Sequence, residues 1–419
     1  MKAVPAGDNA MLVELGEVSA EELHRAAREL RARPGVLAVI PGHSSLYVIR
    51  GEAGAAHAEE VREPREHRLR VVFDGPDLPE LLARVARDVF SERVAGLRLT
   101  ARYLGFRGGF AYLDGWPEEW AMPRRPTSRP VAAGSFAVAG NVAGFYPIDT
   151  PGGWNLLGRT DFDVENAFVP GDTVVLLPTG SDALDARRRQ ARRPSLHTTR
   201  GELLGSPLVT VLRSLAPFDE IAAALALRAV RGDVELLECA MTGPRLRFTR
   251  DAVTAWCDPS LNIRMQRVRA GEELAIGRIS GGLRGYLAIG DDEGIIAKVA
   301  RGDRHVIHAW RGPHDVGLGE VECDVTPQLD RVGVRLRPRT PLRVDIPADL
   351  RSSGMQTGTV QLHPDGSLVA MGPDHPVTGG YLQPMTVLTS ERWKLAQLMP
   401  GERVTLVAST PESPASVWR

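Results

Sequence analysis

The chain is poor in lysine and cysteine. Lys2, Lys298 and Lys394 are its only lysines, although 51 of its 419 residues are lysine or arginine. A lysine nucleophile or a phosphate-binding lysine therefore has few possible positions. The three cysteines are scattered, which argues against a disulfide framework or a zinc motif and is typical of proteins from a reducing compartment.

Long apolar runs are absent too. No stretch of about 18 consecutive apolar residues occurs, and the opening sequence MKAVPAGDNAMLVEL does not place a basic region before an apolar one. We therefore expect a cytoplasmic protein with no membrane partner. The 51 basic and 52 acidic residues give a net charge of −1, so we expect no nucleic-acid partner either.

Several common catalytic motifs are missing. The sequence contains no GxxxxGK[ST], no GxGxxG after a strand, no GxSxG, no HExxH and no CxxC. The run HVIHAWRGPH holds His305, His308 and His314, but it has the pattern of a strand, where positions three apart face opposite sides. We expect no metal site, and the catalytic residues stay unknown.

Glycine and proline punctuate the stretch from residue 123 to residue 172. Glycines separate short runs of Val, Phe, Ala and Leu, which is typical of strands joined by tight turns, because glycine adopts positive φ at little steric cost. This stretch predicts a compact β-domain.

The same order of glycines returns near the C-terminus. The first set of glycines consists of Gly134, the pair 152–153 and Gly171. The second set consists of Gly358, the pair 379–380 and Gly401, and similar runs of residues follow the members of both sets. We interpret this as a divergent internal repeat and expect two related β-domains. Coincidence is the alternative in a chain with 43 glycines.

A small α/β unit is predicted at the N-terminus. Residues 11–15 form a strand-like run, and Ser19 with Glu22 gives a capping-box signature before a helical pattern over 20–33. Two more strand-like runs follow. Further on, Asp77 is expected to cap a helix over 78–90.

Aromatic side chains gather just before the glycine-rich stretch, although they make up only 5% of the chain. Phe106, Phe110, Tyr112, Trp116 and Trp120 lie close together in sequence. Packing in the core is one interpretation, and stacking of one or two rings on a ligand is the other.

Arginines stand beside the glycine turns. Arg124 and Arg129 lie in the proline-stiffened run PRRPTSRP, and Arg159 follows the turn GGWNLLG, so a fold that joins these turns would make a site for a carboxylate or phosphate. Salt bridges to Asp149, Asp161 or Asp163 are the structural alternative. In the second copy a parallel group consists of Arg331, Arg335, Gln361 and Thr378.

The two halves are joined by an arginine-rich segment over 181–205, which is typical of a solvated linker, with nucleic-acid contact as the alternative. Beyond residue 207 the pattern is strand-rich, with one clear helix candidate over 219–230.

Several longer motifs resemble a known family. The runs GFRGGFAYL, MPRR, AGSFAVAG and GFYPIDTPGGWNLLGRT between residues 105 and 160 resemble the KipI family, which supplies the B subunit of bacterial ATP-dependent 5-oxoprolinase. The runs LECAMTGPRLRF, GLRGYLAIG, LDRVGVRL, SSGMQTGTVQLHPDG and DHPVTGGY between residues 237 and 381 resemble its companion KipA, which supplies the C subunit. The resemblance covers nearly the whole chain, in the order B then C.

The resemblance implies a mainly β, α+β fold: a small α/β N-terminal domain followed by cyclophilin-like β-barrel domains related to the carboxyltransferase part of urea carboxylase. The expected limits are 1–60 for the small domain, 68–180 for the first barrel, 181–205 for the linker, and 206–300 and 301–419 for two KipA-like β-domains.

The resemblance also implies an activity. Together with the LamB/YcsF-type 5-oxoprolinase component, such proteins open 5-oxoproline to glutamate with ATP, so we expect ATP to serve the assembled complex and expect neither biotin nor a metal. An alternative is a regulatory protein that binds a sensor histidine kinase, as KipI does. Allophanate hydrolase is disfavoured, because the Ser-Ser-Lys centre in a glycine-serine-rich loop is absent.

The expected ligand site combines the residues beside the glycine turns of both halves with Asn141, which stands where the family usually has glutamine. The candidate ligand-binding residues are Phe106, Tyr112, Arg124, Arg129, Asn141, Tyr146, Gly152, Gly153, Trp154, Arg159, Arg331, Arg335, Gln361, Thr378, Gly379, Gly380 and Tyr381.

Overall fold

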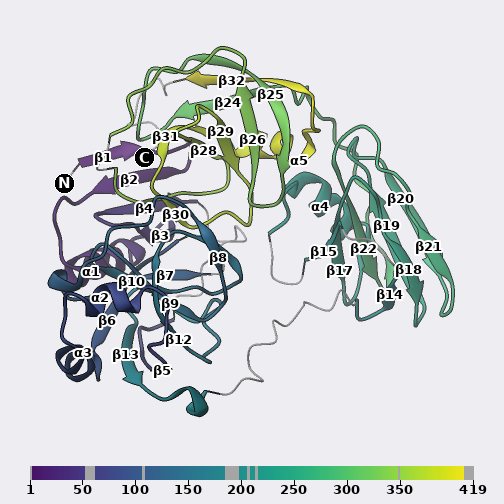
Figure 1. The fold of residues 1–419 in the computed structure, drawn as a ribbon. Coiled ribbons are helices and arrows are strands. Elements are labelled where there is room, and N and C mark those ends of the chain that lie inside the picture. Colours follow the sequence, from purple (N-terminus) through teal and green to yellow (C-terminus); the bar gives the residue numbers. More distant parts are fainter. Residues whose placement is uncertain are drawn as a thin grey trace.

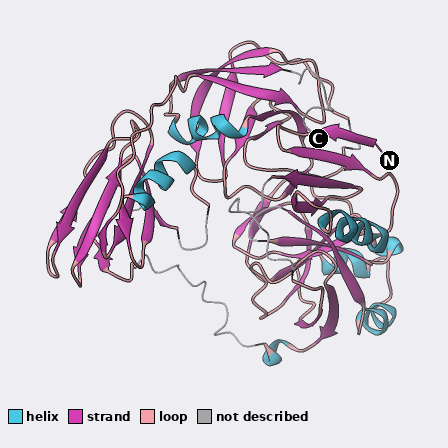
Figure 2. Ribbon diagram, turned by 180° about the vertical axis from the view of Figure 1, so that it is seen from behind, coloured by secondary structure: helices cyan, strands magenta, loops and turns pink. Residues whose placement is uncertain are grey.

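The computed structural model describes residues 2–51, 62–105, 109–184, 198–204, 208–212, 216–347 and 350–409. Strands dominate and the helices are few and short, as expected from the sequence (Figures 1 and 2). The described residues form four units: an N-terminal sheet, a first barrel, a middle unit of two sheets, and a second barrel.

The N-terminal sheet has the strand order β1-β2-β4-β3 and is covered on one face by α1. Ser19 caps this helix as predicted: the Glu22 backbone N–H donates to Ser19 Oγ, and Ser19 N–H donates to Glu22 Oε2 at 2.8 Å. The first strand was not predicted. The elements are β1 (Lys2–Pro5), β2 (Ala10–Glu14), α1 (Ala20–Arg31), β3 (Val36–Pro41) and β4 (Ser45–Arg50).

The first barrel is a seven-stranded sheet of order β12-β9-β10-β7-β6-β13-β5. Its two edges meet where Val72 and Arg159 exchange backbone hydrogen bonds of 2.9 Å. The small pair β8 and β11 lies beside it. The strands are β5 (Glu66–Val71), β6 (Arg98–Gly105), β7 (Phe110–Asp114), β8 (Arg129–Val131), β9 (Ser135–Ala139), β10 (Val142–Phe145), β11 (Thr150–Gly152), β12 (Asn155–Arg159) and β13 (Thr173–Pro178).

The single helix predicted over 78–90 is wrong. The chain forms two short helices instead, α2 (Leu78–Leu82) and α3 (Arg87–Val94), and Asp77 makes no side-chain cap. Leu81 and Phe90 are both buried in the barrel core, yet nine residues of continuous helix would turn them to opposite faces. The break lets both side chains reach the core.

The second barrel is closed, with the order β24-β31-β28-β29-β26-β25-β32. α5 (Arg392–Gln397), which was not predicted, precedes its last strand. The small pair β27 and β30 lies beside it. The strands are β24 (Val306–Arg311), β25 (Glu320–Leu329), β26 (Gly333–Pro338), β27 (Ser353–Gly354), β28 (Thr359–Leu362), β29 (Leu368–Met371), β30 (Thr378–Gly379), β31 (Leu382–Val387) and β32 (Arg403–Ser409).

The two barrels share one topology. In each, the last strand pairs parallel with the first and antiparallel with the second, as β13 does with β5 and β6, and β32 with β24 and β25. The remaining strands follow in the same order, and each barrel carries one two-stranded pair at the matching place.

The predicted glycine correspondences fall at equivalent turns. Gly134 and Gly358, with φ of 79° and 89°, directly precede β9 and β28. Gly171 and Gly401, with φ of 96° and 86°, stand before the last strands. These positions confirm the internal repeat, because left-handed φ values at the same points of one topology give a physical reason for keeping glycine.

The middle unit packs a three-stranded and a five-stranded sheet around one apolar cluster and also contains the small pair β16 and β23. A second apolar cluster lies where α4 (Glu220–Arg228) covers the five-stranded sheet. This helix was predicted over 219–230. The strands are β14 (Gly201–Leu203), β15 (Val209–Val211), β16 (Val230–Arg231), β17 (Glu235–Ala240), β18 (Arg245–Phe248), β19 (Ala252–Cys257), β20 (Ile263–Val268), β21 (Glu273–Ala275), β22 (Arg284–Gly290) and β23 (Asp292–Glu293).

The second barrel contacts all three other units. Thr378 Oγ1 donates to Leu104 O of the first barrel at 2.6 Å, and His43 N–H of the N-terminal sheet donates to Ser352 O at 2.8 Å. Arg284 Nη1 of the middle unit donates to Ala396 O at 2.7 Å. Figure 1 shows the two barrels on either side of the N-terminal strands, with the middle unit next to the second barrel.

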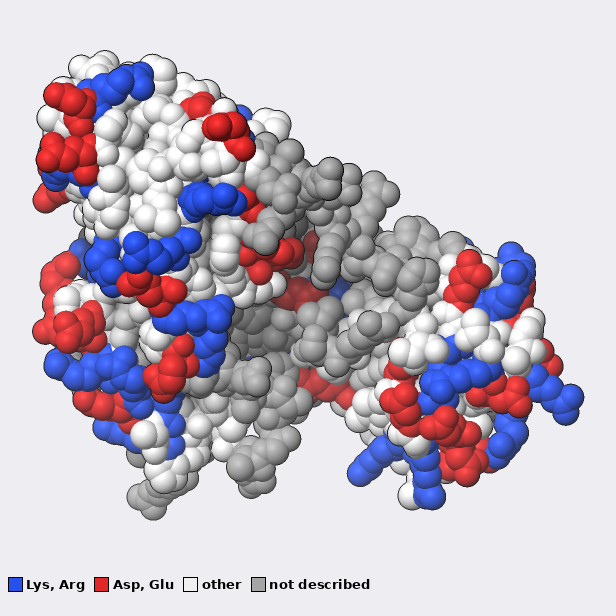
Figure 3. All heavy atoms as spheres, turned by 90° about the horizontal axis from the view of Figure 1, so that it is seen from below, with Lys and Arg blue, Asp and Glu red and all other residues white. Residues whose placement is uncertain are grey.

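Charged side chains of both signs are mixed over the face of the molecule seen in Figure 3, and they form no large patch of one sign there. None of the described helices combines the length and the apolar composition that a membrane-spanning helix requires.

Candidate functional site

A pocket of about 800 Å³ lies between the two barrels, lined by matching parts of each. The first barrel contributes the turn after β11, and the second contributes β30 and the residues after it. The structure places many of the predicted ligand-binding residues in its lining. They are Tyr112, Arg124, Tyr146, Gly152, Gly153, Trp154, Arg335, Gln361, Thr378, Gly379, Gly380 and Tyr381.

Glycines are required where the turns approach the pocket walls. A Cβ atom at Gly152 would collide with the Tyr146 hydroxyl, and one at Gly379 would collide with Nε2 of Gln361. A Cβ atom at Gly153 would lie 3.2 Å from Arg124 Nε. The two glycine pairs therefore let polar side chains pack directly against the backbone of the site.

One wall is aromatic. Trp154 meets Phe110 edge to face, with ring centroids 5.1 Å apart, and Phe110 meets Tyr146 at 5.4 Å. Tyr112 stacks on Tyr103 behind it, at 4.4 Å. Burial raises the pKa of Tyr112 to about 12 and also raises that of Tyr146, so both phenols keep their proton at neutral pH and can donate hydrogen bonds.

Trp116 and Trp120, by contrast, lie in the core of the first barrel, so for these two rings packing is the correct interpretation. Phe106 lies outside the described residues.

Arg124 supplies positive charge to the pocket. Its side chain is exposed, and within the described part of the chain no carboxylate lies within 4 Å of it. Its charge acts to lower the pKa of both Tyr112 and Tyr146, against the larger effect of burial. A guanidinium beside an aromatic wall suits a small molecule that carries a carboxylate or a phosphate.

Arg129 and Arg159 do not line this pocket. Arg129 pairs with Asp77, which also accepts a hydrogen bond of 2.6 Å from Arg125, and Arg159 pairs with Asp74 at 2.8 Å. Both guanidinium groups bind carboxylates outside this pocket, which agrees with the salt-bridge alternative, and an anion-binding role for Arg129 and Arg159 stays a prediction. Their partners also differ from Asp149, Asp161 and Asp163, the aspartates expected from the sequence.

Two other candidates lie elsewhere. Arg331 is bound to Glu238 and Asp374, with distances of 2.8 and 2.7 Å, and so joins the second barrel to the middle unit. Asn141 is exposed in the hairpin between β9 and β10 and does not line the pocket.

The facing wall belongs to the second barrel. Gln361 is 3% exposed, and its Nε2 lies 3.6 Å from Met355 Sδ. Tyr381 stacks on His363 with ring centroids 4.1 Å apart. Arg335 Nη1 donates to Asp365 Oδ2 at 3.0 Å and to Ser367 Oγ at 2.8 Å.

Sequence reasoning missed His363, although it ends the run VQLH directly before a turn in the resemblance motif. Burial and the nearby Arg335 lower the pKa of His363, so its imidazole is neutral at pH 7. The pocket thus offers a neutral hydrogen-bonding ring that the sequence pattern alone did not single out.

Histidines 305 and 308 bind carboxylates of their own. His305 Nδ1 lies 2.8 Å from Asp303 Oδ1, and His308 Nδ1 lies 2.9 Å from Glu391 Oε1. Within the described ranges, no group of three or more His, Cys, Asp or Glu side chains is placed to hold a metal ion.

Family models match both halves. Residues 1–169 match the carboxyltransferase domain, subdomains C and D, and residues 216–298 and 296–408 match subdomains A and B. The solved structure of the protein TTHA0988 is similar over 96% of this chain and 99% of its own, with a TM-score of 0.72 and 25% identity.

Three curated relatives each match less than half of this chain. The B subunit of 5-oxoprolinase from Escherichia coli O157:H7 is 33% identical over 203 residues, which are 41% of this chain and 93% of the relative. The protein of the same name in Bacillus subtilis strain 168 is 31% identical and covered to 80%. A putative urea carboxylase of Emericella nidulans is 24% identical over 46% of this chain and 22% of its own length. The chain therefore belongs to the carboxyltransferase-domain family that includes the B subunit of 5-oxoprolinase, with the C and D subdomains fused ahead of the A and B subdomains.

Proposed function

We propose that this chain is the fused B and C component of an ATP-dependent 5-oxoprolinase, which opens 5-oxo-L-proline to L-glutamate together with a separate LamB/YcsF-type component. The observation that carries the proposal is the pocket between the barrels, since both halves contribute to its lining. A fusion holds the two halves of the site in a fixed relative position, which is a direct physical advantage for binding and catalysis.

The pocket suits a small cyclic amide with a carboxylate. The Arg124 guanidinium would bind the carboxylate, because no carboxylate of the described chain competes for it. Trp154 and Tyr146 would pack against the ring carbons. The phenols of Tyr112 and Tyr146 and the amide of Gln361 would donate hydrogen bonds to oxygen atoms of the substrate.

The reaction needs activation of the amide. The lactam carbonyl is stabilised by resonance, so transfer of the γ-phosphoryl group of ATP to its oxygen would make the carbon a better electrophile. A first water then adds to that carbon, the ring C–N bond breaks and the nitrogen takes up a proton, which leaves an acyl phosphate. A second water hydrolyses the acyl phosphate, so that the new carboxylate and phosphate separate. Glutamate, ADP and phosphate result, and hydrogen-bond donors at the oxygen would stabilise its developing charge.

Glutamate release tests this proposal. The purified chain, alone and mixed with a LamB/YcsF-type protein, is incubated with 5-oxoproline and ATP. We expect glutamate in the mixture only, and expect Arg124→Gln to reduce kcat/KM by about tenfold or more, from the loss of a charge-assisted hydrogen bond. Arg269→Gln, at an exposed position of the middle unit, is the matched control and should leave the rate unchanged.

A mixture of two folded proteins that releases no glutamate would contradict the proposal. A separate titration of ATP into the chain alone measures whether this component binds the nucleotide itself.

A further inference from the structure

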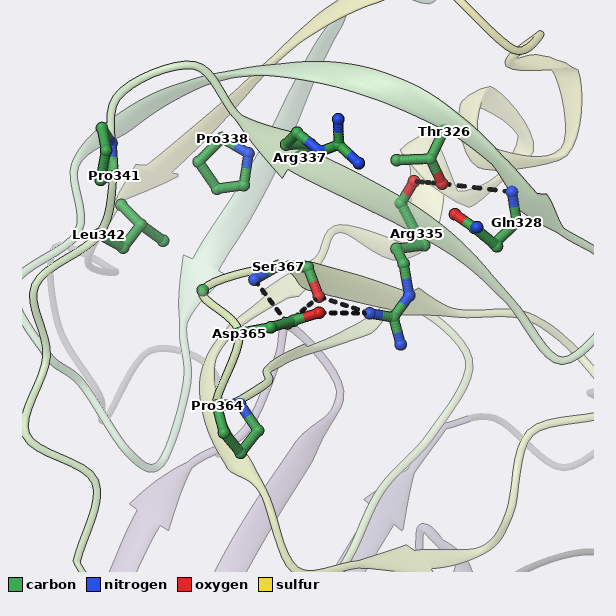
Figure 4. A pocket seen from close by; sticks show the side chains of 11 residues that line it. Thr326, Gln328, Arg335, Arg337, Pro338, Pro341, Leu342, Pro364, Asp365 and Ser367 are labelled. Carbon is green, nitrogen blue, oxygen red and sulfur yellow. Dashed lines mark hydrogen bonds and ion pairs between the residues drawn. The ribbon is translucent and has the colours of Figure 1, made fainter. Parts of the chain in front are cut away.

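A second pocket, of about 880 Å³, lies on the outer face of the second barrel (Figure 4). Strands β25 and β26 form one side, and the turn from Pro364 to Ser367 forms another. Pro338, Pro341 and Leu342 add an apolar side. Neither the family resemblance nor the proposed reaction accounts for this pocket.

Arg335 is held rigidly in it. Its Nη1 donates to Asp365 and Ser367, and Ser367 in turn donates to Asp365 Oδ1 through its N–H at 3.0 Å and its hydroxyl at 2.6 Å. The bonds from Ser367 keep the pKa of Asp365 below its ordinary value, so the carboxylate stays ionised. Figure 4 shows the Arg335 side chain directed at this pair. The guanidinium therefore keeps its position while Nε and Nη2 remain for a ligand.

Arg337 adds a second positive charge. It lies two residues further along β26, so its side chain leaves the same face of the strand as Arg335. Its side chain is exposed, and no carboxylate in the described ranges lies within 4 Å of it. Two guanidinium groups and one carboxylate leave the pocket with a net positive charge.

We propose that this outer pocket binds a small organic anion, a phosphate or a carboxylate, with a short carbon body. The oxygen atoms would bridge Arg335 and Arg337, and the carbon body would pack against Pro338, Pro341 and Leu342. The inference does not depend on the proposed 5-oxoprolinase reaction.

The two pockets share one charged residue. Arg335 lines the pocket between the barrels as well as the outer pocket. An anion at one site neutralises part of the attraction that Arg335 exerts on the other, so anions at the two sites weaken each other's binding. The outer pocket is in this way a place from which an anion can regulate the inner one.

Calorimetric titration of the purified full chain with inorganic phosphate, and separately with acetate, tests the proposal. Arg337→Gln should weaken phosphate binding at one class of site by about tenfold or more, since a charge-assisted hydrogen bond is lost. Arg343→Gln is the matched control, because Arg343 is an exposed neighbour that does not line the pocket. Arg124→Gln should leave the site that depends on Arg337 intact.

The two probes distinguish the chemistry: tighter binding of phosphate points to a phosphorylated ligand, and equal or tighter binding of acetate points to a carboxylate. An unchanged isotherm for Arg337→Gln would overturn the proposal, as would the absence of binding for both probes. Equal losses in Arg337→Gln and Arg343→Gln would also overturn it, because general attraction to surface charge would then explain the data.

Discussion

Arg331 of the second barrel forms an ion pair with the buried Glu238 of the middle unit, with Arg331 Nη1 2.8 Å from Glu238 Oε1. Glu238 Oε2 also accepts hydrogen bonds from the Tyr286 hydroxyl at 2.7 Å and from Phe218 N–H at 2.9 Å. The residues on either side of Arg331, Asp330 and Val332, line the pocket between the barrels. The middle unit therefore holds one wall of that pocket in place.

Arg331→Gln should destabilise the protein by about 1–3 kcal/mol, because Glu238 would lose one of its two cationic partners and keep only Arg284, whose Nε lies 3.4 Å from Glu238 Oε1. Urea unfolding measures this loss. Arg267→Gln, which breaks a fully exposed pair with Asp292 and Glu293, should leave the midpoint nearly unchanged. Normal stability of Arg331→Gln combined with lost ligand binding would instead make Arg331 a ligand contact.

The two glycine turns that border the pocket between the barrels provide a second prediction. Gly152→Ala and Gly379→Ala should each lower stability by about 1–3 kcal/mol and weaken ligand binding, because the new Cβ atom displaces Tyr146 or Gln361 from the pocket wall. Thermal unfolding and ligand titration report the two effects. Gly277→Ala is the control, since nothing lies within 4 Å of its Cβ position and its φ is not positive. Wild-type values for all three variants would show that the turns tolerate a side chain.

Acid sensitivity should arise partly at Asp172. Burial alone would raise the pKa of this carboxyl group, but hydrogen bonds from Arg65 N–H, Arg62, Val169 N–H and His67 outweigh it and hold the pKa below the ordinary value of 3.8. Since the folded-state pKa is the lower one, the charged form contributes stability above pH 3.8. That contribution is lost as the pH falls through the folded-state pKa.

Asp172→Asn should accordingly be less stable than the wild type at pH 7 and should lose less stability on acidification below pH 3.8. Urea midpoints measured across the acidic range check this, with the exposed Asp345→Asn as control. Parallel pH profiles of the wild type and Asp172→Asn would rule out the carboxylate as a source of acid sensitivity.

Local patterns could be predicted from the sequence. The capping box of Ser19 and Glu22 depends on residues three apart, and the positive φ of Gly134 and Gly358 depends on the turn itself. The order of glycines indicates the repeat, and the topology that both copies share rules out the alternative of coincidence.

Partners distant in the sequence could not be predicted. Arg129 and Arg159 bind Asp77 and Asp74, which lie 52 and 85 residues away, and no local pattern indicates either pairing. The helix break after Leu82 likewise follows from the position of the barrel core and not from the helical spacing of apolar residues. Only the fold distinguishes Arg124 from Arg129 and Arg159, because it places a carboxylate beside the latter two and no carboxylate of the described chain beside Arg124.

The most direct test of the shared pocket is the binding of 5-oxoproline to the full chain, measured by calorimetric titration for the wild type, Arg124→Gln and Arg159→Gln. We expect Arg124→Gln to weaken binding by about tenfold or more, because its guanidinium lines the pocket without a carboxylate partner in the described chain. Arg159→Gln should bind as the wild type does, because Arg159 pairs with Asp74 outside the pocket. Unchanged binding by Arg124→Gln together with a loss in Arg159→Gln would contradict the assignment of the pocket.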